Sequence, residues 1–284
     1  MTNERVEPEP EDGVRAADKA GQDVVIAFGQ SLKTLRVRAG MQREELGRRL
    51  GYSASTIASF EQGRRIPPPR AIDQADKELG ADNLLVVWKE PVEKAQYPVF
   101  FQGMAQLEKQ AIELLSYDTM VVKGLLQTEE YMRALLAMRR PLLDEETIEQ
   151  RVTARLARQA IFDRRPAPLL SFVMDESVLR HQYGGKAVLR GQLEQLLLIG
   201  QRRNVEIQVM PTDCEDNAGV NGPFTVVTRK DGKKFLYVEA QNTSTLSTDP
   251  ELTVLAAARY GIIRSQALSP RESLAFIKKL LGEL

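Results

Sequence analysis

The feature that most constrains the fold is the stretch at residues 41–65, MQREELGRRLGYSASTIASFEQGRR. Leu46 and Leu50 recur at helical spacing and predict a first helix over residues 42–50. Gly51 can adopt the left-handed conformation that ends many helices. The pattern therefore predicts a short helix followed by an abrupt turn.

A second helix is predicted directly after this turn, over residues 54–62. Ser53 can cap it by accepting hydrogen bonds from its free backbone amides. Ile57 and Phe60 share the inward face, whereas small and polar side chains cover the outward face. Such a face fits the major groove of DNA, which predicts the recognition helix of a helix-turn-helix. The residues expected at the bases are Ala54, Ser55, Ser59 and Gln62, with Ser53 and Thr56 beside them.

Local charge favours a polyanionic partner. Residues 33–70 hold nine lysines and arginines against three glutamates, whereas the whole chain has 39 basic and 39 acidic residues. Arg64 and Arg65 follow the second helix and suit phosphate oxygens, because a guanidinium can bind them bidentately. Glu61 can orient its neighbours through a local ion pair. A helical hairpin with a solvated arginine face is the alternative interpretation.

Residues 32–86 resemble the lambda-repressor-type (Xre-like) helix-turn-helix domain. The resemblance lies in the stretch REELGRRLGYSASTIASFEQGRRIP and in the flanking helices. The resemblance implies a mainly α, five-helix domain over residues 24–88. It also implies that Gln42 and Arg43 contact backbone phosphate, while the alanine and serines of the second helix read bases. Alanine and serine make weak base contacts, so specificity is expected to be modest or to depend on DNA shape. The other implied helices lie at residues 24–39, 70–79 and 82–88.

The chain is long enough for one further domain. Of its 284 residues, about 190 remain beyond a five-helix domain. The single cysteine, Cys214, excludes an intrachain disulfide. The sequence has neither an apolar run of spanning length nor a secretion signal. We therefore expect a cytoplasmic protein without membrane contact, nucleoid-associated when bound to DNA.

Two segments are expected to lie outside the domains. Residues 1–23 carry seven acidic against three basic side chains and two prolines, which predicts a disordered acidic tail. Residues 89–98 are polar and punctuated by proline, which predicts a linker. Neither segment is assigned a function.

Residues 99–284 are expected to form an α+β domain with a small sheet of about four strands. Asp231-Gly232 is a favoured hairpin pair and joins the last two strands. Thr128 can cap a helix at 129–138, and Ser269 can cap the last helix. Strands are predicted at 169–174, 205–210, 224–229 and 235–239. Further helices are predicted at 100–115, 144–161, 187–203, 249–264 and 270–281.

Residues 98–281 are similar to the C-terminal domain of WhiJ-like actinobacterial regulators. The similarity rests on the order of five stretches, GLLQTEEYMRAL, FVMDESVLR, NVEIQVMP, GPFTVV and SPRESLAFIKKL. That family is also described as antitoxin-like, because a small partner protein is commonly encoded beside it. The resemblance implies a transcriptional regulator whose C-terminal domain receives a signal and passes it to the DNA-binding domain.

Three arginines, Arg151, Arg155 and Arg158, share one face of the helix predicted at 144–161. They can hold an acidic partner, or they can pair within the chain with Glu176. Both interpretations stay open at this point.

Catalysis and cofactors are not expected. A restriction-type nuclease would place a lysine two residues after the strand carboxylate Glu239, and the sequence has a glutamine there. His181 is the only histidine, which disfavours zinc sites and Ser-His-Asp triads. The chain also lacks a glycine-rich phosphate loop. We expect no metal, no cofactor and no enzymatic activity.

These patterns together predict a sequence-specific transcriptional regulator that binds double-stranded DNA. A homodimer is expected, because one such domain buries too little DNA to be selective and two-fold proteins match palindromic sites. The alternative is an antitoxin-like interaction module that neutralises a small protein encoded nearby and autoregulates its operon. An enzyme fused to a DNA-binding domain ranks third.

Overall fold

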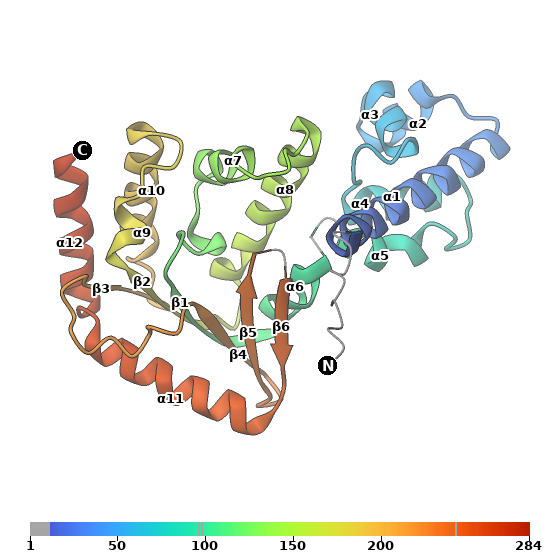
Figure 1. The fold of residues 1–284 in the computed structure, drawn as a ribbon. Helices are drawn as coiled ribbons and strands as arrows, with labels where there is room; N and C mark the ends of the chain where they lie inside the picture. The colour runs from blue at the N-terminus through green and yellow to red at the C-terminus, as the bar shows by residue number, and fades with distance from the viewer. Residues whose placement is uncertain (1–11, 96, 98, 242) are drawn as a thin grey trace, which may run out of the picture. The chain divides into compact units, whose positions relative to one another are not determined.

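The computed structural model describes residues 12–95, 97, 99–241 and 243–284. The chain forms two compact units, Met1–Gln102 and Gly103–Leu284 (Figure 1). The first unit is helical, and the second combines helices with one sheet. Within the described ranges, no helix is both long enough and apolar enough to cross a membrane.

The helix-turn-helix pair lies where the sequence predicts it. Both of its helices match the predicted bounds to within one residue. The first helix instead begins at Asp12, so residues 12–23 of the expected tail are helical, and residues 1–11 lie outside the described residues. The first four helices are α1 (Asp12–Arg38), α2 (Arg43–Leu50), α3 (Ala54–Glu61) and α4 (Pro69–Glu78).

The fifth helix predicted at residues 82–88 is wrong. The Asp76 carboxylate accepts backbone hydrogen bonds from the amides of Leu85, at 2.8 Å, and Asn83, at 3.0 Å, and these bonds hold a turn. A 3₁₀ turn, η1 (Val86–Trp88), and helix α5 (Lys89–Ala95) follow. The segment predicted as a linker is therefore helical over most of its length.

The core of the first unit explains its stability. Phe28 and Leu32 of α1 pack with Leu46 of α2 and with Ile57 and Phe60 of α3, and each is at most 2% exposed. Burial of one such side chain stabilises a fold by about 1.5–3 kcal/mol. The recognition helix is thus anchored by its inward face and leaves its outward face available.

The sheet of the second unit has six strands, not about four. Their order is β3-β2-β1-β4-β5-β6, with β1, β2 and β3 parallel and the remaining pairs antiparallel. The four predicted strands are present, and β1 and β6 are the two that were not predicted. The bounds are β1 (Ala111–Asp118), β2 (Leu169–Asp175), β3 (Val205–Met210), β4 (Phe224–Arg229), β5 (Lys234–Ala240) and β6 (Thr243–Ser247).

The helix predicted at residues 100–115 is wrong in its second part. Helix α6 (Val99–Gln110) stops at Gln110, and the chain continues as β1. The apolar residues of β1 suit both periodicities, and pairing with β2 and β4 decides for the strand.

Helices cover both faces of the sheet (Figure 1). Helix α11 lies on one face, where Tyr260 and Ile263 pack against Tyr117 and Phe224 of the strands. The predicted caps at Thr128 and Ser269 are confirmed. The helices are α7 (Glu129–Ala137), α8 (Glu145–Arg158), α9 (Glu176–Arg180), α10 (Lys186–Ile199), α11 (Pro250–Gln266) and α12 (Pro270–Glu283), with 3₁₀ turns η2 (Gly124–Leu126) and η3 (Gln159–Asp163).

Candidate nucleic-acid interface

The turn between α2 and α3 has the geometry of a helix-turn-helix. Gly51 is left-handed, with φ of 77°, and ends α2 as predicted. The Ser53 hydroxyl accepts a hydrogen bond from the amide of Thr56 at 3.1 Å and so caps α3. The Tyr52 ring meets the Phe60 ring edge-on, with 5.4 Å between centroids. These contacts fix the angle at which α3 leaves the turn.

Two glycines let the backbone approach α3 closely. A Cβ on Gly29 of α1 would lie 2.5 Å from the carbonyl oxygen of Phe60 and 2.6 Å from that of Glu61. A Cβ on Gly47 of α2 would lie 2.5 Å from the carbonyl oxygen of Tyr52, in the turn. Either position must therefore lack a side chain for α3 to keep its place.

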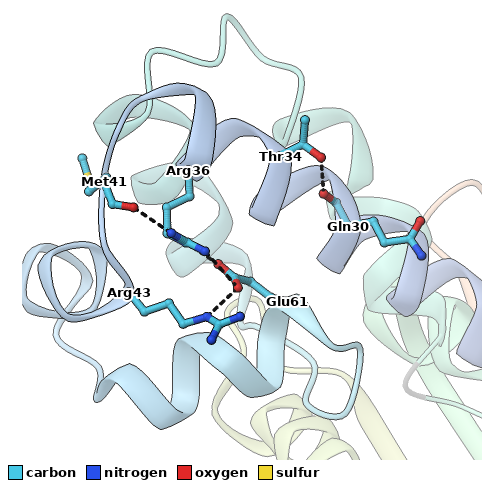
Figure 2. A network of polar contacts seen from close by, with 6 residues as sticks. All are labelled: Gln30, Thr34, Arg36, Met41, Arg43 and Glu61. Carbon is cyan, nitrogen blue, oxygen red and sulfur yellow. Dashed lines mark hydrogen bonds and ion pairs between the residues drawn. The ribbon is translucent and has the colours of Figure 1, made fainter.

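A buried ion network joins α1, α2 and α3 at Glu61 (Figure 2). The Glu61 side chain is 0% exposed and accepts from Arg43 Nε at 2.7 Å. Both Nε and Nη2 of Arg36 donate to the same carboxylate. Arg36 Nη1 donates further to the carbonyl oxygen of Met41 at 2.7 Å. Glu61 forms an ion pair as predicted, but with Arg36 and Arg43, which are 25 and 18 residues away, and not with a local neighbour. The network fixes the C-terminal end of the recognition helix.

Two residues at the start of α2, Gln42 and Arg43, were predicted to contact the phosphate backbone of DNA. Gln42 is the exposed N-cap residue, and its side chain makes no capping bond. The Arg43 side chain is 37% exposed although its Nε binds Glu61. A guanidinium has further N–H donors, so Arg43 can bind phosphate while the network stays intact.

The outward face of α3 carries the predicted base-reading residues. Ser55 is exposed, whereas Ala54, Thr56 and Ser59 are half-buried. The Ser53 hydroxyl lies 2.8 Å from the Ser55 hydroxyl and 2.9 Å from that of Thr56. Ser53 therefore acts as a cap that also orients its two neighbours, and Ser55 is the side chain most open to a groove.

Two exposed arginines follow the recognition helix. Gly63, with φ of +68°, reverses the chain, and the amides of Arg64 and Arg65 then donate to the carbonyl oxygen of Ser59 at 3.0 and 3.2 Å. Both arginines are thereby held at the end of α3. Exposed guanidinium groups at this position suit contacts with phosphate.

Sequence reasoning missed Arg36, which is only 7% exposed. A signal for it exists, because Phe28, Leu32 and Arg36 recur every four residues and so share one helical face. A basic residue that continues an apolar stripe predicts a buried partner of opposite charge.

In the second unit, the predicted arginines of α8 are bonded within the chain. Arg158 binds Glu108 of α6 bidentately, at 2.7 and 2.8 Å, and both side chains are buried. Arg155 Nη1 donates to the side-chain oxygen of Gln127 at 2.8 Å. Arg151 also has an interaction within the chain. Internal bonding therefore occupies at least part of this face.

The predicted pairing of these arginines with Glu176 is wrong. The Glu176 carboxylate accepts from Arg180, four residues further along α9, at 2.7 Å. Its other oxygen accepts from the amide and the hydroxyl of Thr212, both at 3.2 Å. Arg155, Arg158 and Glu176, which were predicted as parts of one partner site, therefore bind different partners.

Residues suited to metal or nucleophilic chemistry are scattered. The described ranges contain no group of three or more histidine, cysteine or acidic side chains that could hold a metal ion. The His181 ring stacks on Tyr183 with 5.2 Å between centroids. Cys214 is a free, half-buried cysteine that packs against the core cluster to which Tyr260 and Ile263 of α11 belong.

Two protein-family models match the chain. Residues 27–86 match a helix-turn-helix domain, which supports a DNA-binding regulator, and residues 101–279 match the family described as "Domain of unknown function (DUF5753)". Neither a curated protein nor a solved structure matches. Since the larger match covers more than half of the sequence, the chain belongs to the DUF5753 family and carries a helix-turn-helix domain before its family domain.

Proposed function

We propose that the chain is a sequence-specific, non-catalytic transcriptional regulator. The single observation that carries this proposal is the outward face of α3, on which Ser55 is exposed, in a unit that also exposes the phosphate-binding candidates Arg43 and Arg65. In this arrangement Ser55 and Ser59 contact base edges, and the arginines hold the phosphates on either side. The chain acts as a homodimer on a palindromic site, because one such domain contacts few bases.

The second unit supplies regulation in this proposal. It receives a small protein partner or a ligand, and the occupied state changes the affinity of the first unit for DNA. A partner or ligand can shift that affinity only if it binds the DNA-bound and the DNA-free protein with different free energies.

Replacing Ser55 with alanine tests the base-reading role. The variant is expected to lose about 1 kcal/mol, roughly fivefold, on DNA from upstream of the gene, because one neutral hydrogen bond is removed. Binding to scrambled DNA should stay unchanged. Ser265→Ala, at an exposed serine of α11, is the control. Equal losses on both DNAs, or no loss on either, would contradict base reading by Ser55.

A further inference from the structure

One face of the sheet in the second unit carries an unusual row of polar side chains. The strand register places Ser116 of β1 opposite Thr225 of β4, and Thr225 opposite Tyr237 of β5. The Ser116 and Thr225 hydroxyls lie 3.2 Å apart, and Lys123 Nζ donates to Thr225 at 2.7 Å. The Ser116 hydroxyl also donates to Asp118, and the Tyr237 hydroxyl donates to Glu239, each at 2.7 Å, so the row is polar along its length.

Helix α8 adds positive charge to the same region. Arg155 is electrostatically coupled to Arg151, Arg158 and Arg139, and among carboxylates chiefly to Glu239 of β5. Glu108 neutralises Arg158. Arg158 lies close enough to Arg155 to disfavour its charge, because close like charges destabilise one another.

The positive charge of Arg155 is poorly compensated by the bonds that Arg155 itself makes. Its one hydrogen bond within the described residues runs from Nη1 to the neutral amide of Gln127, and no carboxylate lies within 4.0 Å of it there. Desolvation, with the neighbouring Arg158, lowers the pKa of Arg155 to about 10, so the group stays charged at pH 7 in surroundings that disfavour its charge. Nε and Nη2 of Arg155 remain as hydrogen-bond donors, and the planar guanidinium group fixes their geometry.

The backbone comes close to these guanidinium groups at Gly124. Gly124 follows the carboxyl end of β1, the edge at which α/β sheets most often bind ligands. A Cβ on Gly124 would lie 3.6 Å from Arg155 Cδ and 3.6 Å from Arg158 Nη1, at ordinary contact distance. The backbone thus approaches both arginines with no side chain between.

We propose that Arg155, beside Gly124 and the polar row of β1, β4 and β5, binds a small molecule through an oxyanion group, either a phosphate or a carboxylate. The free donors of the Arg155 guanidinium group bind two oxygens of the ligand. This site is independent of the DNA-binding role of the first unit.

Calorimetric titration of the full chain with inorganic phosphate and with malonate, at constant ionic strength, tests the proposal. Saturable binding of at least one anion is expected, and Arg155→Gln should weaken it more than tenfold, because a charge-assisted hydrogen bond contributes about 1.5–3 kcal/mol. Arg203→Gln, at an exposed arginine, should bind like the wild type. The better-bound anion identifies the ligand's group. No saturable binding of either anion, or unchanged binding by Arg155→Gln, overturns the proposal.

A second variant keeps the test valid if Arg155→Gln folds poorly. Gly124→Asp places a carboxylate beside the intact guanidinium groups, so it should raise the thermal midpoint and abolish anion binding. Gly124→Ala adds only a methyl group in ordinary contact and should retain binding within about threefold. Undiminished binding by Gly124→Asp would contradict the assigned position.

Discussion

Replacing Glu61 with alanine is expected to destabilise the first unit by about 3–5 kcal/mol, because the substitution leaves the buried guanidinium of Arg36 without its counter-charge. Trp88 is the only tryptophan of the chain and packs against the core of this unit, so its fluorescence reports the loss during urea unfolding. DNA binding should fall with the folded fraction, since Glu61 also holds the end of α3.

A matched control separates this effect from a general loss of charge. Glu44 lies on the same domain, is exposed and makes no hydrogen bond or ion pair within the described residues. Glu44→Ala should change stability by less than about 0.5 kcal/mol. If Glu61→Ala and Glu44→Ala unfold at the same urea concentration, the network does not stabilise the unit.

The second large effect is expected at Arg158 in the other unit. Arg158→Met should destabilise that unit by about 3–5 kcal/mol, because Glu108 would remain buried without its bidentate partner. Calorimetric melting of the full chain measures the change. The double variant Glu108→Leu with Arg158→Met should recover much of the loss, since two apolar side chains leave no buried charge behind.

Arg203→Met serves as the control for this pair, because Arg203 is exposed. A single variant as stable as Arg203→Met would show that the ion pair contributes nothing. A double variant that is no more stable than Arg158→Met would show that packing, and not the unpaired charge, accounts for the loss.

The sequence predicts the helix-turn-helix closely because its signals are local. The left-handed Gly51 and the Ser53 cap act within one turn of the chain, so their spacing alone places α2 and α3. Arg36 and Glu61 are 25 residues apart, and their contact exists only when α1 and α3 pack together. Such a pair has no local spacing that marks it.

The second unit was predicted less well for the same reason. Ala111 and Leu114 continue the helical spacing of α6, and only pairing with two neighbours makes that segment β1. Strand β6 consists mostly of serine and threonine, and its one neighbour in the sheet is β5, so it has no apolar alternation to reveal it. The polar row behind the proposed anion site depends on register across β1, β4 and β5, which the sequence alone does not specify.

Fluorescence anisotropy tests DNA recognition by the first unit most directly. The full chain is titrated with DNA from upstream of its gene and with scrambled DNA, between about 50 and 200 mM salt. We predict tighter binding to the upstream DNA and a slope of log affinity against log salt that flattens by about 1 in Arg65→Ala, but not in Arg203→Ala. Equal, weak binding to both DNAs, with the same slope in Arg65→Ala, would contradict a phosphate-anchored reader of DNA sequence.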